Sequence, residues 1–298
     1  MGYLFLSIAL LAGATKGFCG KKMGDFAENT KSAVFLNFVR MLLCILFSVP
    51  MLFLTGEALT FSLELPLLLI SALSGISTSF FVVLWLLAVR KSAYMMLDVF
   101  LTLGTLLPML GGYFLFDEAI GPLQWVGFLL LVGAVLLMCS YNNQIKARIT
   151  VRGLLLLTAC GLACGTADLS QKMFVRMLPT HSKALFNLYT YVFAALTLGV
   201  CYLLFFFKGT LSFKGEARTK RRIYPLIGVM ALALILNSYF KTQAAAYLNA
   251  VYLYPLNQGA ALAISTLMAA LFFSERPNGR CLMGIAVAFA GLLIINLT

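Results

Sequence analysis

The stretches LLAGATKGFCGKKM at residues 10–23 and GLACGTADLSQKM at residues 161–173 decide the fold, because they are two copies of one pattern. Both place small residues and a few charges inside an apolar segment, and both end in Lys-Met. The first copy carries Lys16 and the second carries Asp168. The recurrence predicts a chain built from two related halves.

The repeat extends well beyond these two stretches. A shift of 150 residues places Lys22-Met23, Thr30, Ser32 and Asn37 on Lys172-Met173, Thr180, Ser182 and Asn187. Further along, a shift of 157 residues places Glu118 on Glu275, Gly127 on Gly284 and Ala88 on Ala245. We therefore predict a duplication, with the first repeat at 1–145 and the second at 146–298.

The composition places the chain among membrane proteins with several spanning segments. Hydrophobic residues make up 62% of the 298 residues, charged residues only 11%, and the mean hydropathy is +0.97, whereas a soluble domain carries about 25% charged residues. A bilayer-spanning helix needs about 20 apolar residues. We predict ten such spans, at 3–20, 34–55, 66–88, 93–116, 123–141, 153–171, 184–207, 224–246, 251–274 and 281–297.

The net charge of +12 is distributed by topology rather than in a nucleic-acid-binding patch. Of the 22 lysines and arginines, 16 fall in the connections on one side of the predicted spans and 3 on the other; the remaining Lys16, Arg40 and Lys241 lie within spans. Because cytoplasmic loops are rich in Lys and Arg, the basic side is cytoplasmic and both termini face out. The short connections favour a bacterial inner membrane.

Five spans per repeat predict that the second repeat is inserted in the opposite orientation. Inverted repeats are typical of secondary transporters, whose substrate site lies between the repeats near the bilayer midplane. A duplication that serves packing alone is the alternative.

The closing segment AAYLNAVYLYPLNQGAALAISTLMAALFFSERPNGRCLMGIAVAFAGLLII, at 245–295, has a weaker copy at 88–138. With the five-plus-five plan, it resembles the drug/metabolite transporter superfamily, EamA-type ten-helix branch. The resemblance implies a central cavity lined mainly by 3–20, 66–88, 93–116, 153–171, 224–246 and 251–274, with 123–141 and 281–297 as scaffold or dimer contacts. Four-helix relatives carry a coupling glutamate in the first helix, where this chain carries Lys16.

Four ionisable residues lie deep in the predicted spans, where such groups are costly and mark function or a buried partner. By the predicted topology, Lys16 and Asp98 lie in the cytoplasmic half, and Asp168 and Lys241 lie in the outer half. We hypothesise two gate pairs, Lys16–Asp98 inside and Asp168–Lys241 outside. Two alternatives remain: Asp168 pairs with Lys172 one turn along the same helix, or Lys16 or Lys241 binds a substrate carboxylate or phosphate directly. Arg40 and Lys172 are predicted to lie nearer the helix ends, where long side chains reach water.

Neutral polar residues recur at helical spacing and extend the predicted cavity lining. Asn257 and Gln258 are adjacent amides in the middle of a span, and unpaired polar groups in hydrocarbon cost several kcal/mol. For the other members, helix packing is the alternative. The further predicted lining residues are Tyr254, Tyr94, Thr102, Asn237, Thr78 and Trp85.

These features favour a secondary active transporter of a small polar metabolite, amino-acid-like or zwitterionic because the acids and bases balance. The alternatives are a lipid-handling protein of the scramblase or flippase type and an intramembrane transferase. We expect no catalytic residues, cofactor or metal, and no nucleic-acid partner. The expected partners are a small-molecule substrate and the lipid bilayer. Coupling to protons or ions, and a monomer or homodimer, stay open.

Overall fold

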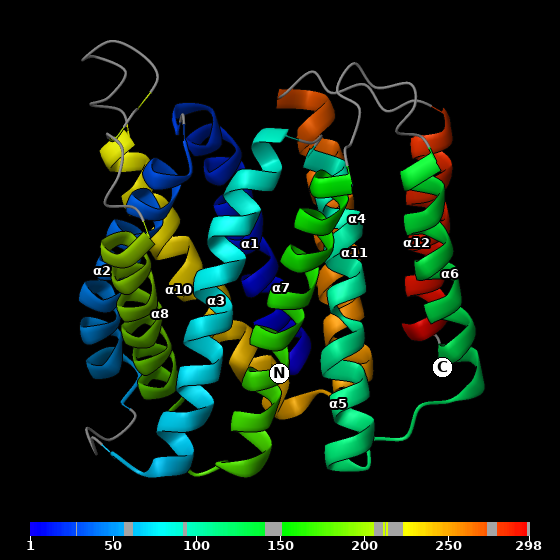
Figure 1. The fold of residues 1–298 in the computed structure, drawn as a ribbon. Helices are drawn as coiled ribbons and strands as arrows, with labels where there is room; N and C mark the ends of the chain where they lie inside the picture. Colours follow the sequence, from blue (N-terminus) through cyan, green and yellow to red (C-terminus); the bar gives the residue numbers. More distant parts are fainter. Residues whose placement is uncertain are drawn as a thin grey trace.

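A computed structural model describes residues 1–27, 29–56, 62–91, 94–140, 151–205, 211, 213, 223–272 and 279–296. These residues form an all-helical bundle (Figure 1), in which the only β pairing described is an isolated bridge between Ala27 and Phe213. The helices are α1 (Gly2–Phe26), α2 (Thr30–Leu54), α3 (Leu65–Lys91), α4 (Tyr94–Gly104), α5 (Leu106–Phe116), α6 (Pro122–Ser140), α7 (Val151–Met177), α8 (Lys183–Phe205), α10 (Ile223–Tyr247), α11 (Ala250–Phe272) and α12 (Gly279–Asn296).

Each predicted span holds one helix, except that α4 and α5 share the span predicted at 93–116. The break falls at Thr105, whose backbone N–H and hydroxyl both donate to the carbonyl of Thr102, at 3.2 and 2.7 Å. Pro108 explains the break, because proline has no N–H to donate to Gly104 and its ring crowds the carbonyl four residues earlier. Hydropathy stays high across the break, so the span was predicted as one helix.

The distribution of side chains is consistent with a membrane-embedded protein. Within the residues that the structure describes, seven helices are long and apolar enough to cross a bilayer. Large apolar side chains such as Leu54, Phe114 and Leu129 are exposed on the outside of the bundle, whereas Asp98, Asp168 and other polar groups are buried. In a soluble protein this pattern would be reversed.

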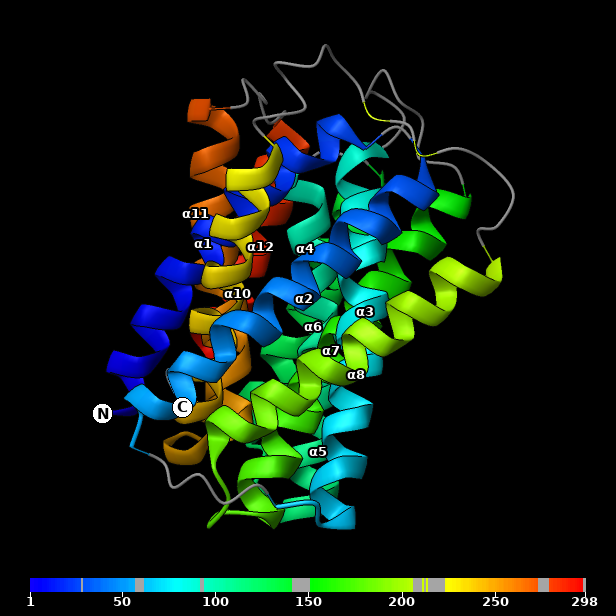
Figure 2. The same ribbon diagram turned by 90° about the vertical axis from the view of Figure 1, so that its left-hand side faces the viewer.

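The bundle is built from contacts between helices that are distant in sequence. Helix α1 packs on α10, α3 packs on α7 and α8, and α2 packs on α8 and α10. Helices α6 and α12 pack on each other at one side of the bundle in Figure 1, and Figure 2 views the opposite side, where α2 and α8 lie in front. Both termini lie in the lower half of the bundle in both views.

Glycines set the closest helix contact. A Cβ on Gly165 of α7 would overlap the carbonyl oxygen of Gly104 at the end of α4, and a Cβ on Gly161 would overlap the carbonyl oxygen of Phe100. The backbones of α4 and α7 therefore touch directly, as small residues allow in membrane helices. Gly13 of α1 similarly faces the Asn237 side chain of α10.

Buried apolar side chains of the described residues pack in three clusters. One cluster includes Met23, Leu86, Leu97 and Ile223, close to the ends of α1 and α3 and the starts of α4 and α10. Another includes Leu6, Leu52, Phe174, Phe186 and Tyr254, where Phe174 and Phe186 stack with ring centroids 4.2 Å apart. The third includes Met41, Tyr191 and Leu234 and joins α2, α8 and α10.

Candidate functional site

A cavity of about 140 Å³ lies among α1, α2, α3, α4, α7, α8, α10 and α11. In the described part of the chain, α6 and α12 contribute none of its lining. Their role as scaffold or dimer contacts stays a prediction. The lining also includes α2 and α8, which the resemblance did not place among the main lining helices. The polar and charged lining residues are Lys16, Arg40, Thr78, Trp85, Asp98, Cys164, Asp168, Gln171, Thr190, Tyr191, Asn237, Ser238, Lys241, Asn257, Gln258 and Ser265.

The structure brings most of the predicted lining residues together at this cavity. They come from six helices, three in each half of the chain. They are Lys16, Thr78, Trp85, Asp98, Asp168, Asn237, Lys241, Asn257 and Gln258. What these residues bind stays a prediction.

The remaining three predicted residues do not line the cavity in the described structure. Tyr254 is fully buried, and its hydroxyl donates to the backbone carbonyl of Asp168 at 2.8 Å. Thr102 is also fully buried, and its carbonyl accepts the Thr105 hydroxyl at the break between α4 and α5. Tyr94 begins α4, but its side chain lies outside the described part of the structure.

Asp168 and Lys241 form a buried ion pair between α7 and α10, with the Lys241 Nζ 2.5 Å from the Asp168 Oδ1. Tyr254 of α11 holds the Asp168 backbone in the same place. One acidic residue thus connects three helices at the cavity wall. The function of this pair as an outer gate stays a prediction.

Lys16 and Asp98 line the same cavity, but in the part of the chain that the structure describes they do not form an ion pair with each other. The Lys16 ammonium instead lies 5.8 Å from the centroid of the Phe81 ring on α3, within the range of a cation–π interaction. The predicted inner gate therefore stays a prediction about another conformation.

The sequence predicted that Lys172 reaches water, and a pair with Asp168 was the alternative for the acid. The structure shows neither. The Lys172 side chain is only 1% exposed, and its ammonium lies 2.8 Å from the Glu118 Oε1. The same ammonium donates to the carbonyl of Leu248 at 2.9 Å. The sequence did not reveal this pair, because Glu118 follows α5 in a connection and lies 54 positions from Lys172.

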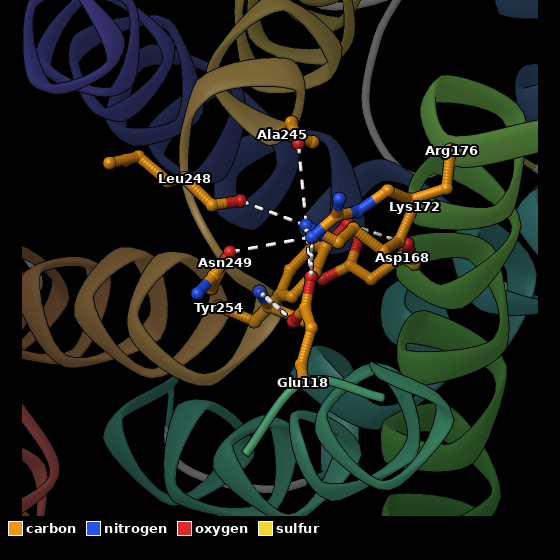
Figure 3. A network of polar contacts seen from close by, with 9 residues as sticks. Glu118, Asp168, Lys172, Arg176, Ala245, Leu248, Asn249 and Tyr254 are labelled. Atoms are coloured by element: carbon orange, nitrogen blue, oxygen red, sulfur yellow. Dashed lines mark hydrogen bonds and ion pairs between the residues drawn. The ribbon is translucent and has the colours of Figure 1, made fainter. Parts of the chain in front are cut away.

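Glu118 is the centre of a polar network that joins three segments (Figure 3). Its Oε1 accepts from Arg176 of α7 at 2.6 Å, and its Oε2 accepts the backbone N–H of Ala250 at the start of α11, at 2.7 Å. Arg176 also donates to the Asn249 side chain at 3.4 Å. Burial alone would raise the pKa of Glu118, but the hydrogen bonds from Lys172, Arg176 and Ala250 outweigh it and lower that pKa.

Arg40 is a cavity residue that the sequence prediction placed elsewhere. It was expected near a helix end, yet it lies in the body of α2, is 3% exposed and lines the cavity. The sequence could have indicated this position, because Arg40 is the eleventh residue of α2 and lies near the middle of an apolar helix.

A chain of hydrogen bonds supports the cavity wall between α7, α10 and α8. The Gln171 Nε2 donates to the Ser238 hydroxyl at 3.2 Å, and Ser238 donates to the Asn187 Oδ1 at 2.5 Å. On the other side of α10, the Asn237 Nδ2 donates to the carbonyl of Ala9 at 2.7 Å. These bonds fix the positions of the polar side chains, because an apolar bundle offers them few other hydrogen-bond partners.

The described residues contain no group of three or more His, Cys, Asp or Glu side chains placed to hold a metal ion.

The comparisons with known proteins show the fold. A solved structure described only as "Crystal structure of protein" is 17% identical, with a TM-score of 0.69, and the match covers 99% of this chain and 96% of the other. No protein-family model matches, and no curated protein matches. The helical arrangement is thus one that a solved protein of similar length also has.

Proposed function

We propose that this protein is a secondary active transporter that moves a small polar metabolite by alternating access through the central cavity. The observation that carries the proposal is a cavity lined by buried acids, bases and amides inside a bundle whose outer surface is apolar. Intramembrane ionisable groups are costly and are retained where solutes or ions pass.

The packing pattern supports an inverted repeat. Helix α1 packs on α10, and its expected counterpart α7 packs on α3, the counterpart of α10. Likewise, α2 packs on α8 and α6 packs on α12, which pairs each helix with its own counterpart. On this proposal, residues 1–145 and 146–298 are related by a two-fold axis, all of these contacts follow from that relation, and the cavity lies between the repeats. On this proposal the fold is of the EamA type.

The contacts of Glu118 can hold one end of the bundle closed during alternating access. It joins the connection after α5 to α7 and to the start of α11, and by the predicted topology it lies on the outer face of an inner membrane protein with both termini outside. Its three donors hold that end of the bundle together. On this proposal, opening toward the outside requires Glu118 to separate from Lys172.

The charged lining favours an amino-acid-like or zwitterionic solute, because acids and bases both face the cavity. The proposal is tested with purified protein, first as ligand-dependent melting in detergent and then as solute counterflow in proteoliposomes. A ligand at 100 times its Kd adds about 2.7 kcal/mol of stability, so a screen of amino acids, quaternary amines, sugars, nucleobases and phosphate esters gives a measurable shift.

Matched asparagine variants separate a cavity effect from a general one. Asn257→Ala removes an amide from the lining, whereas Asn296→Ala removes one from the end of α12, where it donates to the carbonyl of Leu292 in the same helix. We expect Asn257→Ala to abolish saturable counterflow and Asn296→Ala to retain it. Absence of saturable flux for every solute, combined with lipid scrambling by the same vesicles, would refute the transporter proposal.

A further inference from the structure

A tryptophan borders the cavity toward the end of the bundle where α3 ends. Helix α3 runs from the lower to the upper end of the bundle in Figure 1. On α1, α3 and α10, the described lining residues nearest to the upper end are Gly17, Trp85 and Met230. By the predicted topology this end faces the cytoplasm, so the contacts just beyond these residues control that side of the cavity.

The indole ring of Trp85 lies directly on the backbone of Gly20 in α1. A Cβ atom on Gly20 would lie 2.5 Å from the Cζ3 and 2.7 Å from the Cη2 of that ring, too close for a real contact. The same Cβ would lie 3.3 Å from the Cε of Met230. Residue 20 therefore has to be a glycine for the indole to reach α1 at this point, beside Met230.

Apolar side chains fill the bundle beyond this contact. Trp85 packs against the cluster that holds Met23 of α1, Leu86 and Val89 of α3, and Ile227 of α10, all of them buried. These side chains come from the same three helices, so they close the space between them. A polar solute would lose its hydrogen bonds with water in such a layer, so it passes only when the layer opens.

Lys21 fastens α1 to the end of α3 next to the indole. Its ammonium donates to the carbonyl of Val89 at 3.3 Å. The last carbonyls of a helix have no partner within the helix, and lysine side chains can bind them. Lys172 of α7 binds the carbonyl of Leu248 after α10 in the same way, at 2.9 Å. Each bond holds one end of the bundle together.

We propose that Trp85 and Gly20 form the gate of the cavity on the side where α3 ends, and that this gate opens when the indole leaves Gly20. The inference rests on the proposed function and assigns the residues that release the solute to that side. Unlike the predicted pair of Lys16 and Asp98, this contact is present in the described structure. The two ends then close by different chemistry, through apolar packing at Trp85 and through ion pairs at Glu118.

The chain supplies its own reporter for this gate. Cys164 lines the cavity and is partly exposed. With the other six of the seven cysteines replaced by alanine, a membrane-impermeant maleimide labels this thiol alone. The labelling rate is measured in spheroplasts and in inverted membrane vesicles, which present opposite sides of the membrane. Thr180→Cys in a chain without Cys164 marks the opposite side, because Thr180 is exposed in the connection between α7 and α8.

Both partners of the contact are varied, each with a matched control. Trp85→Ala should raise Cys164 labelling from the side where α3 ends by about tenfold or more, which is about 1.4 kcal/mol on the equilibrium between closed and open gate. Gly20→Ala displaces the indole and should raise the same rate by about fivefold or more. Trp125→Ala removes the other tryptophan, which is exposed on α6, and Gly228→Ala adds a Cβ where nothing lies within 4 Å. Both controls should leave the rate unchanged.

The outcomes separate this inference from the proposed function. An unchanged rate in Trp85→Ala or Gly20→Ala overturns the gate, whatever the flux assays give. Equal increases from both sides of the membrane overturn it as well, because they show a general loosening of the bundle. A one-sided increase without saturable flux of any solute supports the gate and refutes the transporter. If Trp85→Ala does not fold, Gly20→Ala decides the question, because it leaves the indole and the cavity lining in place.

Discussion

Replacing Glu118 with glutamine should destabilise the protein by about 3–5 kcal/mol, the cost of breaking a buried ion pair by removing one partner. The Glu118 side chain is 3% exposed and Lys172 is 1% exposed, so water does not replace the lost charge. Glutamine also has one acceptor oxygen where the carboxylate uses two, one for the side chains of α7 and one for the N–H of Ala250. Its amide N–H groups must therefore face another donor.

Two matched variants define the scale of this effect. Arg176→Gln removes the other cation on Glu118, but that side chain is 43% exposed, and exposed pairs contribute about 0–1 kcal/mol. Glu64→Gln makes the same chemical change as Glu118→Gln at a carboxylate that lies 3.2 Å from the His181 Nε2 and is 58% exposed. Both should stay within about 1 kcal/mol.

The free energy of unfolding is measured by titrating the protein in mixed micelles with a denaturing detergent and following helicity. Adding Lys172→Met to Glu118→Gln should recover stability, because the unpaired ammonium is then gone. Equal losses in Glu118→Gln and Glu64→Gln, or no recovery in the double variant, would show that the buried pair does not hold these segments together.

Three further outcomes are expected. Because the pKa of Glu118 is lowered in the folded protein, its contribution to stability is present above the ordinary glutamate pKa and is lost as the pH falls through the lowered value. Acid titrations of Glu118→Gln should lack this loss, and an acid profile equal to that of the original protein would contradict the prediction. Asp168→Asn leaves Lys241 buried without its partner and should lower the free energy of unfolding by about 3–5 kcal/mol in the same micelle titration. Adding Lys241→Met should restore stability, and a double variant that keeps the full loss would argue against the ion pair. Gly165→Ala should destabilise the protein by about 1–3 kcal/mol through overpacking. At Gly228 a Cβ meets nothing within 4 Å, so Gly228→Ala should be neutral or stabilising by up to about 1 kcal/mol. Similar melting temperatures of the two variants would refute the close contact of α4 with α7.

The helical fold was predictable because a bilayer-spanning helix leaves a long apolar run in the sequence. The division between α4 and α5 was not, because Thr105 and Pro108 lie in a segment whose hydropathy does not change. Proline within a span does not by itself predict a break: Pro50 and Pro255 both lie inside continuous helices, α2 and α11.

The site was predictable where a charged residue lay deep within a predicted span. Asp168 and Lys241 stood out as charges within spans, and the structure places them side by side. Arg40 was missed because its depth was misjudged, and that error removed a positive charge from the predicted lining. The pairing of Glu118 with Lys172 depends on how the connection after α5 returns to the bundle, and no local pattern in the sequence carries that information.

The contact between Gly104 and Gly165 gives α7 a fixed point about which it can tilt, because bare backbones there have no side chains to interlock. Arg176 lies eleven residues from Gly165, about 16 Å along the helix, whereas Asp168 lies three residues away, about 4.5 Å. A tilt of about 10° would move Arg176 by about 3 Å and Asp168 by less than about 1 Å over those arm lengths. Such a tilt would separate Arg176 from Glu118 while the Asp168–Lys241 ion pair at the cavity stays closed, so the Glu118 end of α7 can move before the cavity wall changes.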